Sequence, residues 1–314
     1  HLGILQRVVA AMAWVMKRLM GVSGAESLSA AANVFLGQTE APLLVRPYIP
    51  RMTESELNAV MVGGFATIAG SLMAVYAAML GHEDPAAISR MAQHLLGASL
   101  ISAPAGLLVA KTLVPERGEP ETAGKVRLKL ERSTKNVIDA AATGALDGLR
   151  LALNVAAMLI AFIAIIYLLD RFLIFVGELS FVAPAVRFVG LERLDLDGVL
   201  GLLFSPIAWL IGIPPAECRP FGSLLGQAMA ANEFIAYKSL SQMIADQTLS
   251  PRSATLAVYA LCGFANFSSI GIQIAGIGGM APERYHDLAR LGLRAMLGGA
   301  IACWMTACVA SALL

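Results

Sequence analysis

Two polar stretches interrupt an otherwise apolar chain. The first, residues 33–42, reads NVFLGQTEAP and contains two amides, a hydroxyl and a carboxylate. The second, residues 231–237, reads ANEFIAY and contains an amide and a carboxylate. Carboxylate and amide oxygens accept hydrogen bonds from hydroxyl groups, and uncharged oxygens also suit a hard cation such as Na⁺. The two stretches are therefore candidate parts of a binding site.

Each polar stretch is followed by an apolar helix that is interrupted at a similar point. The interruptions read GFAT at residues 64–67 and GFAN at residues 263–266. Paired interruptions at corresponding positions of two halves are typical of the binding site of a transporter. A carboxylate inside a membrane is costly unless it has partners, so such a residue is expected to be functional. We therefore predict a membrane carrier whose solute lies between the two halves.

The composition is that of a membrane protein. Hydrophobic residues make up 57% of the chain, charged residues 14%, and the mean hydropathy is +0.70. Soluble domains have about half apolar and a quarter charged residues. The net charge of +1 predicts no nucleic-acid partner. The four cysteines show no CxxC pair, and we predict no metal or disulfide role for them; they are Cys218, Cys262, Cys303 and Cys308.

The pattern predicts an all-α polytopic membrane protein with inverted structural repeats. Each repeat has a re-entrant hairpin, a broken transmembrane helix and a further transmembrane helix. The expected parts are a helix end and interfacial helix at 1–24, the first repeat at 25–113, a cytoplasmic linker at 114–145, a scaffold helix with an external helix and loop at 146–219, and the second repeat at 220–314.

Several element positions follow from local signals. Thr53 followed by Glu56 predicts a capping box at the start of a helix that runs to about Leu80. The remaining expected elements are a hairpin at 25–50, spans at 86–113 and 146–176, a solvated loop at 115–136, a surface helix and loop outside the core at 177–220, a second hairpin at 220–245, a broken helix at 251–280 and a final helix at 286–314.

The distribution of Lys and Arg predicts the orientation in the membrane. The loop at 115–136 holds six of these residues and the segment 281–294 holds three, whereas the 81–85 turn holds none. Positive loops stay in the cytoplasm. We therefore expect 1–24, 115–136 and 281–294 in the cytoplasm and the C-terminus outside. Hairpin one then enters from the cytoplasm and hairpin two from outside.

Four motifs together resemble the concentrative nucleoside transporter family, over nearly the whole chain and in the same order. They are GQTEAP at 37–42, GFATIAGS at 64–71, NEFIAY at 232–237 and CGFANFSSIGIQIAGIGG at 262–279. The resemblance implies a cation-coupled nucleoside symporter that works by alternating access in a bacterial inner membrane. It also implies a homotrimer in which each protomer has a scaffold and a transport domain. The first helices of the family have no counterpart here, so we expect an N-terminally truncated chain that begins at His1.

The resemblance also implies roles for particular residues. The residues expected to meet the nucleobase, directly or through water, are Gln38, Thr39 and Glu40. Those expected to hold the ribose hydroxyls are Glu233, Asn266 and Ser269, with Phe264 packed nearby. The cation is expected at Asn33, Thr67 and Ser71, with backbone carbonyls near Leu36 and Ile68. No other cofactor is expected.

Purely structural roles remain open for several of these residues. Glu40 and Glu233 could be hydrogen-bonded to hairpin backbone, and Asn33 could be a helix cap. Ser269 could bond to the backbone of its own helix, and Phe264 could be a core residue.

The coupling ion can be Na⁺ or H⁺. Uncharged oxygens favour Na⁺, because none of them titrates near neutral pH, and Thr67 and Ser71 lie one turn apart on the broken helix, so their hydroxyls can share a face. Many family members have a lysine four residues before the asparagine of NEF, where this chain has Ala228, so H⁺ stays open. The spans hold no Asp pair and no Ser–His arrangement, so an intramembrane enzyme is a remote alternative, as is a channel.

Overall fold

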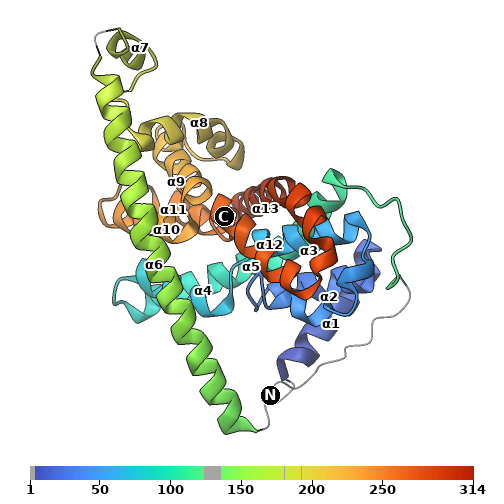
Figure 1. The fold of residues 1–314 in the computed structure, drawn as a ribbon. Coiled ribbons are helices and arrows are strands. Elements are labelled where there is room, and N and C mark those ends of the chain that lie inside the picture. Colours follow the sequence, from blue (N-terminus) through green and yellow to red (C-terminus); the bar gives the residue numbers. More distant parts are fainter. Residues whose placement is uncertain (1–3, 124–135, 180, 192) are drawn as a thin grey trace. The chain divides into compact units, whose positions relative to one another are not determined.

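The described residues of the computed structural model are 4–123, 136–179, 181–191 and 193–314, and their regular secondary structure is helical (Figure 1). Two compact units are distinguished. One comprises His1–Arg7 and Leu128–Val199, and the other comprises Val8–Arg127 and Leu200–Leu314. All of the predicted binding residues belong to the second, larger unit.

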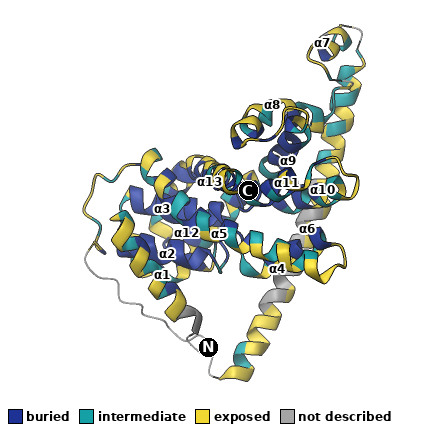
Figure 2. Cartoon of the chain, turned by 180° about the vertical axis from the view of Figure 1, so that it is seen from behind, coloured by how far each residue is buried: buried dark blue, intermediate teal, exposed yellow. Residues whose placement is uncertain are grey.

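The smaller unit is dominated by a long apolar helix. Helix α6 spans Val137–Gly177 and is followed by α7 at Ala183–Phe188. At 1.5 Å per residue, α6 is about 60 Å long, twice the hydrocarbon thickness of a bilayer. Its described apolar side chains are largely exposed, as for Ile138, Ile160 and Leu168, and Figure 2 shows this exposure along the helix. An exposed apolar surface of this kind indicates contact with lipid or with another chain.

The first half of the larger unit contains the first polar stretch and the first broken helix. Its elements are α1 at Ile4–Met20, α2 at Gly24–Asn33, the 3₁₀ turns η1 at Ala41–Val45 and η2 at Ile49–Arg51, α3 at Glu54–Ala66, α4 at Gly70–Gly81 and α5 at Pro85–Leu113. The predicted capping box of Thr53 and Glu56 is confirmed. Thr67 and Ala69 are extended, so the helix is interrupted between Ala66 and Gly70.

The second half of the larger unit contains the second polar stretch and the second broken helix. Its elements are α8 at Leu196–Ile211, which begins in the smaller unit, α9 at Cys218–Ala230, α10 at Glu233–Ala245, α11 at Pro251–Ala260, α12 at Phe267–Met280, η3 at Pro282–Arg284 and α13 at Tyr285–Leu313. Asparagine side chains cap two of the helix starts. Asn232 Oδ1 accepts from the Ile235 N–H, and Asn266 Oδ1 accepts from the Ser269 N–H. The interruption between α11 and α12 is therefore formed as predicted.

The two halves exchange matching contacts. Helix α3 packs on α5 of its own half and on α13 of the other, while α11 packs on α13 of its own half and on α5 of the other. Figure 1 shows α3, α5, α12 and α13 together. The approach at the breaks is close, because a Cβ at Gly263 would lie 2.5 Å from the Phe65 carbonyl oxygen. Cys303 of α13 donates its thiol to the Ala66 and Cys262 carbonyls at 3.4 and 3.3 Å. The two interruptions therefore meet at α13.

Three described helical stretches are long and apolar enough to cross a membrane. They are Glu54–Gly81 with 28 residues, Pro85–Leu113 with 29 and Pro282–Leu313 with 32. The first contains the interruption at Thr67–Ala69. All three coincide with spans expected from the sequence.

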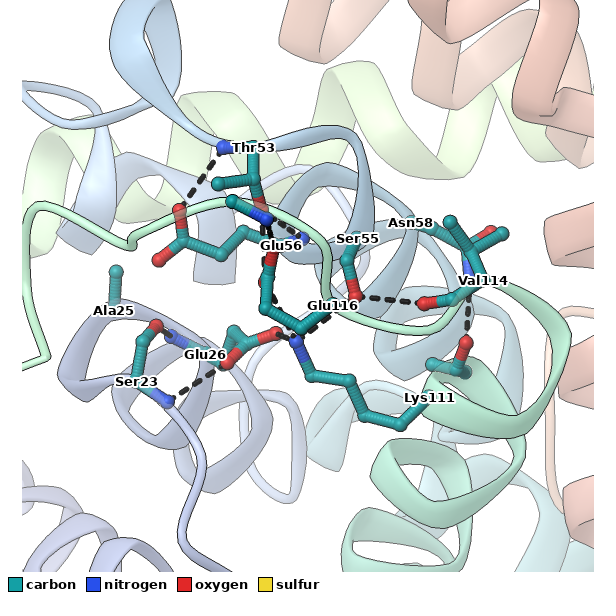
Figure 3. Close-up of polar contacts among 12 residues, drawn as sticks. Ser23, Ala25, Glu26, Thr53, Ser55, Glu56, Asn58, Lys111, Val114 and Glu116 are labelled. Carbon is teal, nitrogen blue, oxygen red and sulfur yellow. Dashed lines mark hydrogen bonds and ion pairs between the residues drawn. The ribbon is translucent and has the colours of Figure 1, made fainter.

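A partly buried cluster of charged residues ties α2, α3 and α5 together (Figure 3). Lys111 Nζ lies 2.5 Å from Glu26 Oε1 and 3.1 Å from Glu116 Oε2, and it donates to Ser55 Oγ at 2.9 Å. The Glu26 side chain is wholly buried. Glu26 also closes a capping box with Ser23 at the start of α2. Lys111 is thus the positive charge that compensates Glu26.

The segment after α5 joins this cluster, which corrects the expected solvated loop at 115–136 in part only, because most of residues 115–123 are exposed. Thr122 is buried, and its hydroxyl oxygen accepts from the Ala25 N–H at 3.0 Å. Burial acts to raise the pKa of the Glu116 carboxyl, but hydrogen bonds from Gly118, Lys111 and Thr53 outweigh it, so the pKa lies below its ordinary value. Residues 124–135 of the predicted loop lie outside the described residues.

Two further expectations differ from the structure. Helix α6 begins at Val137 rather than near residue 146, because Asn136 caps it by accepting from the Asp139 N–H at 2.8 Å. The stretch 177–220 does not lie wholly outside the core. Ala208 and Ile211 of α8 are buried with Phe221 in the main apolar cluster. The prediction was wrong here because it relied on the acidic residues that flank this helix and overlooked its apolar face.

Candidate functional site

Glu233 is a buried carboxylate held by two side chains from other elements. It is the first residue of α10, where a negative charge is favoured by the helix dipole. Its Oε1 accepts from the Tyr76 hydroxyl at 3.0 Å, and its Oε2 accepts from Asn266 Nδ2 at 3.1 Å. Tyr76 is itself stacked on Tyr237, with ring centroids 4.3 Å apart. An ionised carboxylate has about four acceptor sites, so Glu233 can still accept from further hydroxyl donors.

Asn266 links this carboxylate to the start of α12. While its Nδ2 donates to Glu233, its Oδ1 accepts from the Ser269 N–H at 2.9 Å and from the Ser268 hydroxyl at 2.7 Å. The cap therefore fixes the amide, and the second interruption places Asn266 beside Glu233. The Ser269 hydroxyl oxygen accepts from Gln38 Nε2 at 3.3 Å, so its partner lies in the first polar stretch rather than in the backbone of its own helix.

Gln38 completes a chain of side chains that joins both halves. It is buried and donates to Ser269 through Nε2, while its Oε1 accepts from Gln273 Nε2 at 3.1 Å. Gln273 also donates to the Met61 carbonyl of α3 at 3.1 Å. We call this series of hydrogen-bonded residues the polar chain. It draws on α4, α10, α12 and the turn after α2, and its members in order are Tyr76, Glu233, Asn266, Ser269, Gln38 and Gln273.

The other residues expected to bind the solute lie around this chain. Thr39 packs against α12, since a Cβ at Gly276 would lie 2.8 Å from its methyl group. Glu40 is exposed and forms no capping hydrogen bond with η1. Phe264 is buried at the second interruption as part of the main apolar cluster, so its side chain has a core role whatever else it contacts.

Asn33 and Thr67 both lie beside Gly63 of α3. Asn33 is fully buried at the end of α2, and neither atom of its side-chain amide has a hydrogen-bond partner within the part of the chain that the structure describes. A Cβ at Gly63 would lie 3.2 Å from Asn33 Nδ2, and Thr67 Oγ1 donates to the Gly63 carbonyl at 3.0 Å. An unpaired buried amide is costly, so Asn33 fits a role as a ligand better than a role as a cap.

The remaining predicted cation ligands are less uniform. Leu36 and Ile68 lie in the two non-helical stretches, where backbone carbonyls leave the α-helical ladder, and the Gly70 N–H donates to the Phe35 carbonyl at 3.0 Å, which joins the two stretches. Ser71 is exposed. The expectation that Thr67 and Ser71 share a helix face is wrong, because the extended residues between them break the helical period.

Two residues of the polar chain were missed by the sequence analysis. Tyr76 and Gln273 are large polar side chains within the apolar helices α4 and α12. Polar groups at membrane depth face the protein interior. A search for isolated polar residues inside the broken helices would have found both.

The polar chain presents carboxylate, amide and hydroxyl groups and is held in place by bonds between elements that are far apart in sequence. Groups of this kind recognise an uncharged solute that has several hydroxyl groups and a polar ring. Both halves of the larger unit contribute residues to the polar chain.

Comparison with known proteins decides the family. Residues 94–311 match the model of the Na⁺-dependent nucleoside transporter C-terminus, and residues 1–83 match a nucleoside recognition model called Gate. The chain belongs to the concentrative nucleoside transporter family. It is accordingly a multi-pass membrane transporter and not an enzyme.

Members of this family are similar to almost the whole chain. An uncharacterized transporter of Haemophilus influenzae is 44% identical over 99% of the chain and 71% of its own length. Sodium/nucleoside cotransporter 1 of Mus musculus is 38% identical over 100% of the chain and 48% of its own length. The structure of CNTnw in an inward-facing substrate-bound state superposes with a TM-score of 0.85 at 41% identity, over 98% of this chain and 70% of that one.

Proposed function

We propose that this concentrative nucleoside transporter imports nucleosides together with Na⁺ across a bacterial inner membrane. The observation that carries the proposal is the polar chain, in which Glu233, Asn266 and Ser269 are bonded through Gln38 to the opposite half. Glu233, Asn266 and Ser269 would hold the ribose hydroxyls. Gln38, Thr39 and Glu40 would meet the base, directly or through water, beside Phe264.

The chemistry of the chain supports a nucleoside as the solute. A ribose offers hydroxyl donors to the remaining acceptor capacity of Glu233, and its hydroxyl oxygens can accept from amide groups. Sites that hydrogen-bond a hydroxyl reject analogues that lack it, because the buried polar groups of the site are then left unpaired. A neutral solute can be concentrated only if its entry is coupled to an ion gradient.

Na⁺ is the proposed coupling ion because uncharged oxygens gather between hairpin one and α3. The unpartnered amide of Asn33, the hydroxyl of Thr67 and the carbonyls of Leu36 and Ile68 would be the ligands. The exposed Ser71 is the weakest member of this set. H⁺ coupling is the competing proposal, with Glu233 as the titrating group.

The exchange of contacts between the halves supports inverted repeats and alternating access. In each half an interrupted helix packs on the last helix of the other half, as expected when two repeats enclose one site. We propose that α2 with η1 and α9 with α10 are re-entrant hairpins in a transport domain. The exposed apolar helix α6 suits a scaffold domain, and the resemblance to the family suggests a homotrimer.

Uptake by the variant Glu233→Gln tests the proposal. The amide keeps the shape of the carboxylate but replaces one acceptor with a donor, so uridine uptake should fall at least a hundredfold at equal protein in the membrane. The matched control is Glu283→Gln, an exposed position in η3, which should transport normally. Wild-type rates in Glu233→Gln would remove Glu233 from the site.

A further inference from the structure

Gln273 is a buried amide whose orientation is fixed by the backbone. It is fully buried in α12, and its Nε2 lies 3.1 Å from the Met61 carbonyl oxygen and 3.1 Å from Gln38 Oε1. A backbone carbonyl can only accept a hydrogen bond. The Gln273 atom facing Met61 must therefore be the nitrogen.

The orientation of the Gln273 amide also fixes the orientation of the Gln38 amide. A primary amide nitrogen carries two hydrogens, so Gln273 donates one to Met61 and the other to Gln38. The Gln38 atom that faces Gln273 must then be its oxygen, and the Gln38 nitrogen faces Ser269 Oγ at 3.3 Å. One of the two Gln38 N–H groups is used by Ser269, and the second has no partner among the described residues.

A glycine opposite the two glutamines provides the space for this arrangement. A Cβ at Gly64 would lie 2.7 Å from Gln273 Nε2 and 3.1 Å from the Gln38 Cβ. A side chain at this position of α3 would require the Gln273 amide to shift. The contact is thus built from three elements, α3, α12 and the turn after α2.

We propose that Gln273 determines base specificity by fixing the Gln38 amide so that it offers an N–H donor, and not its carbonyl, to the base. The inference rests on the proposed function, in which Gln38 meets the base. The second N–H group of Gln38 can donate a hydrogen bond to an oxo group at the edge of a base. An amino group at the same edge is also a donor, so the two groups cannot form a hydrogen bond. The transporter therefore prefers nucleosides with an oxo group at that edge, such as uridine and inosine, to cytidine and adenosine, which carry an amino group there.

The variant Gln273→Met tests this role. Methionine has a similar length but neither amide group, so Gln38 becomes free to rotate and to present either face. We expect the uptake ratios of uridine to cytidine and of inosine to adenosine, measured as kcat/KM, to move about tenfold toward one, which corresponds to one hydrogen bond. Gln242→Met, on the exposed face of α10, makes the same chemical change elsewhere and should leave both ratios unchanged.

A second variant keeps the inference testable if Gln273→Met does not fold. Gln38→Glu replaces the free donor by an acceptor, so the preference should reverse toward cytidine and adenosine. Two results would overturn the inference. One is an equal loss of uptake of all four nucleosides in either variant, and the other is a wild-type protein whose two uptake ratios already equal one. Failure of the proposed function looks different, because wild-type protein would then take up none of the four nucleosides.

Discussion

At the scale of single residues, the site depends on buried polar groups that orient one another. Glu233 has a donor from α4 and a donor from α12. These two bonds direct its remaining acceptor sites toward the solute. Asn33 is the opposite case, because its buried amide has no partner in the described part of the chain. This difference supports the proposal that the Asn33 amide is a ligand of the coupling cation.

Tyr76→Phe should weaken transport without unfolding the protein. The ring keeps its stack on Tyr237, but Glu233 loses the hydroxyl donor at 3.0 Å. Hydrogen bonds to charged groups are worth about 1.5–3 kcal/mol, so we expect the kcat/KM for uridine to fall by about tenfold or more. Tyr259→Phe, which loses a bond to the half-buried His94, is the matched control. Equal effects of the two changes would argue against a role for Tyr76.

At the scale of elements, helix ends are secured by polar contacts and helix breaks by close approach. Two capping boxes, at Ser23 and Thr53, start α2 and α3, and the cluster around Lys111 joins both to α5 (Figure 3). Gly263 allows the second interruption to touch the first. The cluster around Lys111 thereby fixes the N-terminal ends of α2 and α3, while the two interruptions contact each other.

Lys111→Met should destabilise the larger unit strongly. The change leaves the wholly buried Glu26 without its compensating charge, and removing one partner of a buried pair costs about 3–5 kcal/mol. The double variant with Glu26→Gln should recover part of the loss. Arg290→Met, which breaks exposed ion pairs with Glu54 and Asp287, should cost less than about 1 kcal/mol. Thermal unfolding in detergent measures all three, and similar melting of the two single variants would contradict this account.

At the scale of the whole molecule, the sequence predicted the order of elements well and the contacts between them poorly. The breaks after Ala66 and Ala260, and the start of α3 at Thr53, follow from local signals. Gln38, Glu233, Asn266 and Ser269 were found because their motifs resemble a family. Tyr76, Gln273 and Lys111 were missed, since their importance comes from partners between 85 and 235 residues away in the sequence.

The predicted orientation can be tested by labelling a single cysteine. Glu119→Cys, in a Cys308→Ser background, places an exposed thiol in the segment after α5. Thr122 is unsuitable because it is buried. Since the Lys/Arg-rich loop should lie in the cytoplasm, a membrane-impermeant maleimide should label this thiol only after the cells are opened. Labelling of this thiol in intact cells would show that the orientation is the reverse of the predicted one.

Uridine uptake under an imposed ion gradient tests the central claim most directly. The full-length protein is reconstituted into vesicles, and accumulation is measured with an inward Na⁺ gradient and, separately, with an inward H⁺ gradient. We predict accumulation above the external concentration with Na⁺ alone. Asn33→Ala should lose this Na⁺ dependence, whereas Asn58→Ala, which removes a buried amide bonded to the Ala110 carbonyl, should keep it. Accumulation driven only by the pH gradient, or Na⁺ dependence that survives in Asn33→Ala, would contradict the account.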